Sequence, residues 1–211
     1  MNEGLLLNVA DTMSRSRANG PGVRAVIWVQ GCTIGCPGCY NAFTHPHKSA
    51  KLMQPAEIAK WVDTISDIEG ITFSGGEPFE QAAAIIATID EIRLLCDPKF
   101  SVFAFSGFEY DSLIESEDPV VQELLKRLDI LSAGPYISKL RDTNLLWRGS
   151  SNQTLQYLSK RYSSREEEKW TKESPVEEFT LDNNSMHFTG FEGPGSAILK
   201  SALKQLNQTH H

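Results

Sequence analysis

The sequence predicts an α/β fold built on a parallel sheet or an incomplete barrel, followed by a C-terminal extension. Apolar, β-rich runs alternate with stretches of helical periodicity in the order β-α-β-α-β-α-β. Parallel strands need crossover connections, and the predicted helices supply them along the usual right-handed path. Near residue 158 the alternation stops and a charged segment begins. We therefore expect an α/β domain over residues 1–158 and an extension over residues 159–211.

The first predicted strand and helix lie on either side of a cysteine-rich loop. Residues 23–30 are mostly apolar and rich in β-formers, which is typical of a strand buried in a parallel sheet. The helix after the loop is predicted to begin near Pro55 and to end at Gly70. Its apolar positions follow the amphipathic i, i+3, i+4, i+7 rule: Ile58, Trp61, Val62 and Ile65.

The same unit is predicted again further along the chain. Residues 71–73 form a short strand, and the helix after it carries one apolar face: Ile85, Ile89, Ile92 and Cys96, the last as a small core residue. A third strand over 100–105 leads to a helical stretch from Tyr110. This stretch restarts at Asp118, which can cap a new helix that has Pro119 in its first position. A fourth strand over 129–132 completes the predicted sheet.

The extension has a different texture. Between Lys160 and Glu178 eleven residues are charged, which predicts a solvated helix or a flexible linker. A hairpin is predicted over 179–189 with its turn at 182–185, and a final helix carries Leu199, Leu203 and Leu206. Two roles remain open for the extension. It is either a structural cap on the sheet edge or barrel mouth, or an element that recognises a partner or substrate.

The composition is that of an ordinary globular protein. The 211 residues are 40% apolar and include 20 Lys and Arg against 27 Asp and Glu, for a net charge of −7. An acidic balance without a basic block argues against broad nucleic-acid binding. No apolar run approaches the ~20 residues of a membrane span, and the first residues lack the pattern of a secretory leader. We expect a cytoplasmic protein that does not enter a membrane.

Three of the four cysteines, Cys32, Cys36 and Cys39, fall within eight positions. A closed structural zinc site takes four protein ligands, whereas three thiolates leave one position open. A [4Fe–4S] cluster held by three cysteines would keep one iron free for a substrate. Two alternatives stay open: zinc completed by His45 or His47, and a dithiol redox pair formed by Cys36 and Cys39.

A second unusual loop, Gly75-Gly76-Glu77-Pro78, follows the strand at 71–73. Two glycines leave bare backbone that a small ligand can approach, and the carboxylate can accept a hydrogen bond from an ammonium group. The same residues also suit an ordinary turn before a helix, where the helix dipole would favour the Glu77 carboxylate near the N-terminus. Both loops follow the carboxyl end of a strand, where parallel α/β folds collect their ligands.

Together these motifs resemble those of the radical S-adenosylmethionine (SAM) superfamily. Cys32-x3-Cys36-x2-Cys39 is followed about 40 residues later by the Gly-Gly-Glu-Pro loop. The chain further resembles the activating proteins of anaerobic ribonucleoside-triphosphate reductase over roughly residues 5–155. Four segments carry that resemblance: 19–22 (Asn-Gly-Pro-Gly), 30–32 (Gln-Gly-Cys), 36–41 (Cys-Pro-Gly-Cys-Tyr-Asn) and 147–153 (Trp-Arg-Gly-Ser-Ser-Asn-Gln).

The resemblance implies a partial (βα) barrel in which Cys32, Cys36 and Cys39 hold a catalytic [4Fe–4S] cluster, whose open iron binds the amino and carboxylate groups of SAM. It implies reductive cleavage of SAM to methionine and a 5′-deoxyadenosyl radical. That radical abstracts a hydrogen from a glycine of a large glycyl radical enzyme such as anaerobic ribonucleotide reductase. The electron donor implied is a protein such as flavodoxin or ferredoxin.

The resemblance also assigns contacts to SAM. Gly75, Gly76 and Glu77 would receive its ammonium, Tyr40 would pack on its adenine, and Ser106 and Asp129, at later strand ends, would make polar contacts. For Tyr40 an ordinary packing role remains open. The segment from about Lys160 onward exceeds the short activators. The alternative function is therefore a radical SAM enzyme that modifies a different peptide, nucleotide or small molecule.

Overall fold

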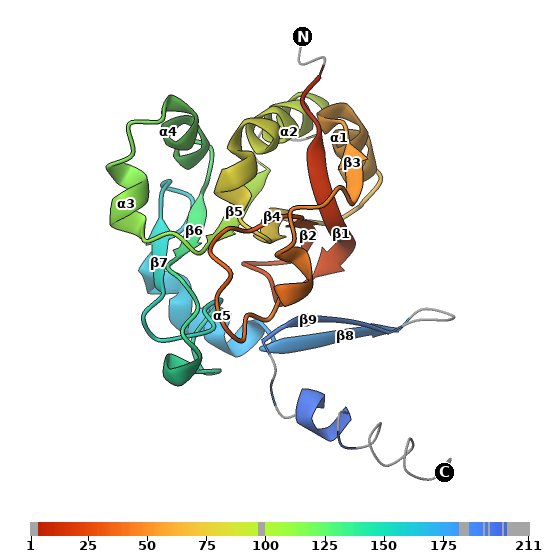
Figure 1. The fold of residues 1–211 in the computed structure, drawn as a ribbon. Coiled ribbons are helices and arrows are strands. Elements are labelled where there is room, and N and C mark those ends of the chain that lie inside the picture. The colour runs from red at the N-terminus through yellow and green to blue at the C-terminus, as the bar shows by residue number, and fades with distance from the viewer. Residues whose placement is uncertain are drawn as a thin grey trace, which may run out of the picture.

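The computed structural model describes residues 4–96, 100–181, 186–191, 193, 195–199 and 201. Within these residues the chain forms a seven-stranded sheet and a two-stranded hairpin (Figure 1). Four strands of the large sheet are those that the sequence predicts: β2 (Arg24–Val29), β4 (Gly70–Gly75), β5 (Ser101–Ser106) and β6 (Ile130–Ala133). They pair in parallel in this order. The predicted α/β fold is confirmed.

Three antiparallel strands extend this parallel centre, and the sequence analysis predicts none of them. β1 (Leu7–Ser16) pairs with β2, and β3 (Lys51–Met53) pairs with β1. On the other side β7 (Thr154–Tyr157) pairs with β6. The strand order is β3-β1-β2-β4-β5-β6-β7, so β3 and β7 are the edge strands. Curvature into a partial barrel remains a prediction.

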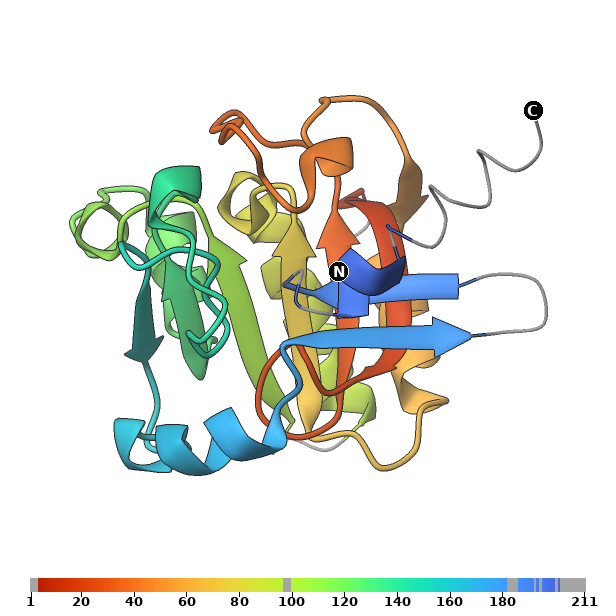
Figure 2. The same cartoon turned by 90° about the horizontal axis from the view of Figure 1, so that it is seen from below.

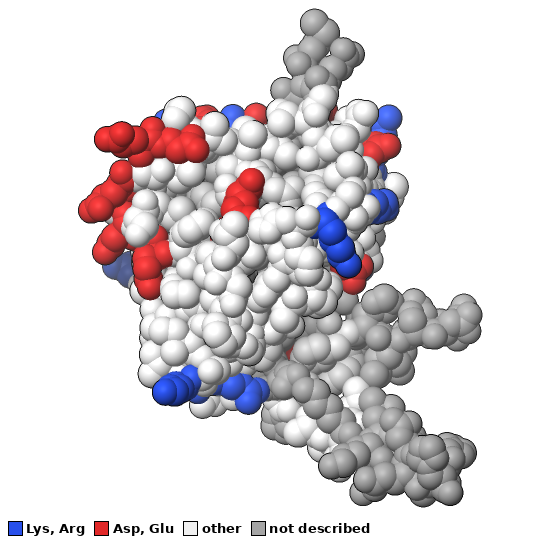
Figure 3. Space-filling view, in the orientation of Figure 1, with Lys and Arg blue, Asp and Glu red and all other residues white. Residues whose placement is uncertain are grey.

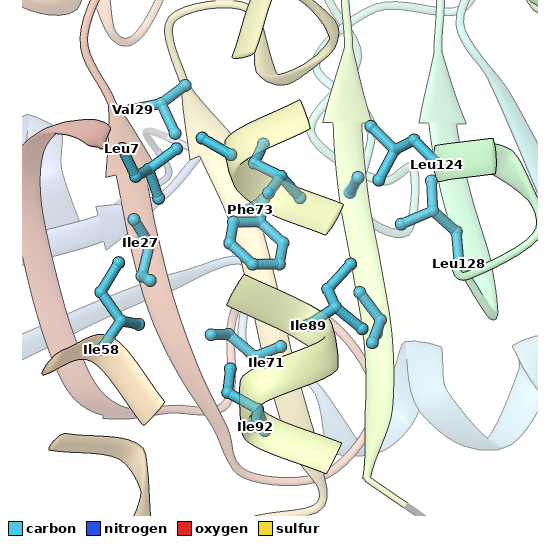
Figure 4. Packing of buried hydrophobic residues seen from close by; sticks show 14 of the residues in the cluster. Leu7, Ile27, Val29, Ile58, Ile71, Phe73, Ile89, Ile92, Leu124 and Leu128 are labelled. Carbon is cyan, nitrogen blue, oxygen red and sulfur yellow. The ribbon is translucent and has the colours of Figure 1, made fainter. Parts of the chain in front are cut away.

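The main core lies between the sheet and the helices α1 (Pro55–Asp63), α2 (Ala82–Leu95), α3 (Tyr110–Ile114) and α4 (Pro119–Leu125). Figure 4 shows strand residues such as Ile27 and Phe73 packed against helix residues such as Ile58 and Ile89. Short 3-10 helices lie between these elements and beyond them: Ala42–Thr44, Pro78–Gln81, Ser138–Leu140 and Ser164–Glu166. Burial of these apolar faces is what joins the helices to the sheet.

The ends of the predicted helices are partly confirmed. The Asp118 side chain accepts a 2.8 Å hydrogen bond from the backbone N–H of Val120, as expected for a capping residue before Pro119. The first helix ends at Asp63, and Gly70 begins β4 rather than ending that helix. Cys96 directly follows α2 and is partly buried against the core.

The face of the sheet opposite to α1–α4 carries a cluster of buried side chains, most of them aromatic. The charged segment forms a helix, α5 (Glu167–Glu173), and the flexible-linker alternative is wrong because Trp170 is buried. The Trp170 ring lies 5.3 Å from that of Trp147, and Trp147 packs in turn on Phe103 of β5. One buried tryptophan therefore docks an otherwise polar helix.

Arg24 of β2 is fully buried on this same face. Its guanidinium donates to the hydroxyls of Thr72 and Ser101 at 2.8 and 2.7 Å and to the carbonyl of Ile71 at 2.6 Å. Burial lowers the pKa of Arg24 from its ordinary value. These contacts satisfy a buried charge, which would otherwise be costly.

The C-terminal hairpin is formed by β8 (Glu177–Leu181) and β9 (Met186–Gly190), as predicted. Figure 2 shows it lying across the strands on the side away from α1 and α2. Residues 195–199 are helical. The predicted turn at 182–185 and the positions Leu203 and Leu206 lie outside the described residues.

The surface carries its charges unevenly. In Figure 3 acidic side chains gather over α3 and α4, where the exposed residues include Asp111, Glu115, Glu117 and Asp118. Among the described residues, no helix has both the length and the apolar character needed to cross a membrane.

Candidate active site

A cavity of about 270 Å³ opens near the carboxyl ends of the parallel strands. Eight of the nine predicted site residues line it: Cys32, Cys36, Cys39, Tyr40, Gly75, Gly76, Glu77 and Ser106. They come from three separate segments, and the parallel order of β2, β4 and β5 brings those segments to one end of the sheet. The topology therefore assembles the two sequence motifs into one site.

The cysteine loop begins where β2 ends and folds back on the segment after it. The backbone N–H groups of Gly31 and Cys32 donate to the carbonyls of Thr44 and His45 at 2.7 and 3.0 Å. Within the loop, the N–H of Cys39 donates to the carbonyl of Cys36 at 3.1 Å. All three cysteines are partly exposed. This backbone anchoring presents the thiols to the cavity.

The protonation of the cysteine thiols depends on whether iron is bound. Burial raises the pKa of both Cys32 and Cys39, so the free thiols are protonated at neutral pH. Cationic irons would reverse that preference, because a bound metal ion favours the thiolate. The donor set of three thiols is the one that leaves one iron of a [4Fe–4S] cluster open.

The described residues do not gather three or more His, Cys, Asp or Glu side chains around a single metal ion. A four-iron cluster does not need such convergence, since each thiolate binds a different iron. His47, one of the two histidines considered for zinc, has its Nε2 atom 2.9 Å from a carboxylate oxygen of Glu80. His45 lines the cavity, and its buried Nε2 atom has no hydrogen-bond partner within the structure.

The Gly-Gly-Glu loop is joined to the cysteine loop by its backbone. The N–H groups of Gly76 and Glu77 donate to the carbonyls of Val29 and Gly31, each at 2.8 Å. A Cβ atom on Gly76 would lie 2.1 Å from the carbonyl oxygen of Gly31, which no side chain can tolerate. Close approach of the two loops therefore requires glycine here, in addition to any access for a ligand.

Glu77 places a buried carboxylate in the cavity wall. It accepts hydrogen bonds from the Ser106 hydroxyl at 3.0 Å and from the N–H groups of Phe79 and Gly107 at 3.0 and 2.8 Å. Burial raises the pKa of Glu77 to about 7, and these hydrogen bonds limit the rise. The carboxyl is thus poised to ionise when a cation binds beside it.

Asp129, the ninth predicted site residue, does not line the cavity. It precedes β6 at the amino end of the strand, opposite to the cavity. Its carboxylate accepts a 2.9 Å hydrogen bond from the N–H of Val102, at the start of β5, and lies 3.6 Å from Arg161. The residue therefore ties the far ends of neighbouring strands together.

Tyr40 belongs to a group of three aromatic side chains, Tyr40, Tyr136 and Phe191, which we call the aromatic collar. The rings of Tyr136 and Phe191 each lie 5.1 Å from that of Tyr40, in edge-to-face orientation. All three crowd Gly149, where a Cβ atom would lie 3.0 to 3.1 Å from each ring. The Arg141 side chain donates to the Tyr40 hydroxyl at 2.7 Å.

Several cavity residues were not assigned a role from the sequence. Asn19 and Gln153 belong to segments that carry the family resemblance, which was the available signal for them. Gln153 accepts from the N–H of Gly149 and donates to the carbonyl of Gly134, both at 2.8 Å, so it fastens the loop beneath the aromatic collar. Phe191 comes from the extension and has no comparable signal in the sequence.

Comparisons with known proteins identify the family of the chain. Residues 18–156 match the family model of the 4Fe–4S single cluster domain. The anaerobic ribonucleoside-triphosphate reductase-activating protein of Salmonella typhimurium is 35% identical over 146 residues, which span 66% of this chain and 92% of that protein. The protein of the same name from Escherichia coli is 34% identical over the same shares, and that from Vibrio cholerae is 33% identical over 65% and 89%. The solved structure of QueE from Escherichia coli has a TM-score of 0.36 and 16% identity over 49% of this chain and 52% of that one. The chain therefore belongs to the 4Fe–4S single cluster domain family and, within it, to the radical SAM activase group that includes the anaerobic ribonucleoside-triphosphate reductase-activating proteins.

Proposed function

We propose that this chain binds a [4Fe–4S] cluster through Cys32, Cys36 and Cys39, cleaves SAM reductively, and generates a glycyl radical on a partner enzyme. One observation carries the proposal. The three cysteines and the Gly75–Glu77 loop line a single cavity and are joined through the backbone of Gly31. Such an arrangement suits a ligand that meets a metal at one end and a carboxylate nearby.

A [4Fe–4S] cluster held by Cys32, Cys36 and Cys39 would, when reduced, supply the one electron that splits SAM into methionine and a 5′-deoxyadenosyl radical, and this radical would take a hydrogen atom from a glycine and leave as 5′-deoxyadenosine. The protein's own residues bind and orient. Glu77 would receive the ammonium of SAM as a carboxylate, held in place by the donors Ser106 and Gly107. The backbone of Gly75 and Gly76, which lines the cavity, would lie beside the ammonium, and Tyr40 would pack on the adenine.

The partner is inferred from the relatives, which are named as activators of anaerobic ribonucleoside-triphosphate reductase. We infer that this chain activates a glycyl radical enzyme of that kind. The exposed positions Thr33, Gly35 and Pro37 put the cysteine loop at the surface. A small electron-transfer protein such as flavodoxin or ferredoxin can therefore approach the cluster closely.

The test is anaerobic reconstitution with iron and sulfide, followed by reduction in the presence of SAM. We expect about four irons per chain and release of 5′-deoxyadenosine. Cys36→Ala serves as the control and should give neither. A colourless, zinc-loaded protein that never cleaves SAM would falsify the proposal. If SAM is cleaved but a candidate reductase gains no glycyl radical signal in electron paramagnetic resonance, the acceptor is a different peptide, nucleotide or small molecule.

A further inference from the structure

The C-terminal hairpin contributes to the cavity although it lies beyond residues 18–156, which match the family model. Four consecutive residues at its end, 188–191, line the cavity. Resting on the function proposed above, we propose that this hairpin is a wall of the SAM-binding cavity that the chain supplies itself, with Phe191 as the residue that positions Tyr40. Its polar anchors, its route into the aromatic collar and its shallow burial all support this role.

Polar contacts hold the hairpin at the cavity. The Asn19 side chain, which also lines the cavity, donates to the Thr189 hydroxyl at 2.8 Å, and both residues are buried. The carbonyl of Asn19 in turn accepts from Thr72 of β4 at 2.6 Å. At the start of the hairpin, Glu178 accepts from the Ser16 hydroxyl at 2.7 Å. The hairpin is thereby positioned relative to β1 and β4.

The chain enters the aromatic collar through a tight turn at the end of β9. Gly190 has φ +96°, and a Cβ atom there would lie 2.3 Å from the carbonyl oxygen of Val176. Position 190 of this turn therefore requires glycine. The next residue, Phe191, donates its N–H to the same Val176 carbonyl at 2.8 Å and sets its ring 5.1 Å from Tyr40. The backbone of the hairpin thus fixes where the Phe191 ring meets Tyr40.

The burial of the hairpin distinguishes a cavity wall from a structural cap. Within the described residues, neither buried hydrophobic cluster includes a residue of β8 or β9. Phe179 and Phe188, whose rings lie 5.2 Å apart, remain 36% and 39% exposed. A cap on a sheet edge would bury its apolar side chains against the core. This hairpin instead directs residues 188–191 at the cavity.

The first experiment measures shielding of the cavity without any cofactor. Metal-free protein is treated with iodoacetamide, and alkylation of each cysteine is followed by mass spectrometry. We expect Phe191→Ala to accelerate alkylation of Cys39, while Cys96, outside the cavity, reacts at the wild-type rate. Phe179→Ala is the matched control, because Phe179 belongs to the same hairpin but does not line the cavity. Equal alkylation rates of Cys39 in wild type and in Phe191→Ala would refute the proposal that the hairpin is a wall of the cavity.

The second experiment measures the dissociation constant of SAM for the reconstituted, unreduced protein by equilibrium dialysis. We expect Phe191→Ala to bind SAM about two- to tenfold more weakly, the effect of losing one edge-to-face aromatic contact. Thr189→Val, which removes one of the two hydrogen-bond acceptors of the Asn19 amide and keeps the side-chain shape, should weaken binding in the same direction. Phe179→Ala should bind as wild type does.

The outcomes separate this inference from the proposed function. Wild-type affinity in both Phe191→Ala and Thr189→Val overturns the positioning role, even if SAM is still cleaved. Absence of SAM binding in the reconstituted wild type overturns the proposed function and, with it, the assignment of this wall to SAM. In that case faster alkylation of Cys39 in Phe191→Ala would still show that the hairpin encloses the cavity. Circular dichroism of each variant confirms that it folds.

Discussion

Replacing Glu77 by glutamine should change how the stability of the protein depends on pH. Burial raises the pKa of Glu77 from its ordinary value of 4.5 to about 7. The folded protein therefore holds this proton more tightly than the unfolded chain does. The stabilisation from the protonated carboxyl is complete below about pH 4.5 and is lost as the pH rises through 7.

The size of the effect follows from the pKa values. A rise from 4.5 to about 7 corresponds to a loss of about 3 kcal/mol in unfolding free energy across the full range. Between pH 5 and pH 8 the loss is about 2–3 kcal/mol. Glutamine has no such titration, but its amide N–H₂ would face donors such as the Gly107 N–H, at a cost of about 1–3 kcal/mol. Glu77→Gln should thus be less stable than wild type at pH 5 and equal or more stable at pH 8.

The assay is urea unfolding of the metal-free protein from pH 5 to pH 8 under anaerobic, reducing conditions. Any pH dependence that wild type and variant share cancels in the difference between them. Glu123→Gln is the control. Hydrogen bonds from Arg127 and Lys126 lower the pKa of Glu123, so it titrates below this pH range. A stability difference for Glu77→Gln that stays constant from pH 5 to pH 8 would refute the reasoning.

Three further predictions concern iron binding and packing. Alanine at any one of the cavity cysteines should strongly deplete iron in reconstituted protein, whereas Cys96→Ala should keep it. The iron content of each reconstituted variant tests this, and loss of iron in Cys96→Ala would contradict the assignment of the cluster to Cys32, Cys36 and Cys39. Gly76→Ala should lower the unfolding free energy by about 1–3 kcal/mol, because its Cβ would meet the Gly31 carbonyl oxygen at 2.1 Å. An unchanged urea midpoint would mean that the two loops can separate freely. Trp170→Ala should cost about 3–5 kcal/mol in the same assay, and a negligible loss would show that α5 is not anchored by its tryptophan.

The parallel centre of the fold could be predicted because its strands are buried on both faces. A mostly apolar run as short as 23–30, rich in β-branched residues and followed by glycine, is typical of a buried strand rather than of a helix. β1 escaped prediction because its burial is irregular along the strand, and its pairing with β2 shifts register between Val9 and Asp11 and again between Met13 and Ser16. Such bulges break the alternation that identifies a strand.

Residues that line the cavity were predictable where their types have few other uses in a protein. Clustered cysteines and paired glycines indicate chemistry or close backbone contact, and the cavity contains them. Asp129 lies at the amino end of both the predicted strand and β6, whereas the cavity opens at the carboxyl ends, so proximity to a strand boundary alone does not indicate a place in the cavity. Phe191 could not be found this way, since its contact with Tyr40 joins positions far apart in sequence and depends on the turn at Gly190.

The backbone junction between the cysteine loop and the Gly-Gly-Glu loop has a consequence for how such proteins diverge. Val29 pairs with Gly75 in the register of β2 and β4, so the separation of the two motifs in space is set by a hydrogen-bond ladder. The chain between them passes through β3 and α1 and does not enter that register. Insertions or deletions in this crossover should therefore be tolerated by selection. A one-residue shift in the register of β2 and β4 should not be tolerated, because it would move the two motifs apart. Searches for distant members of the family gain by leaving the gap between the motifs free and fixing the residues at the two strand ends.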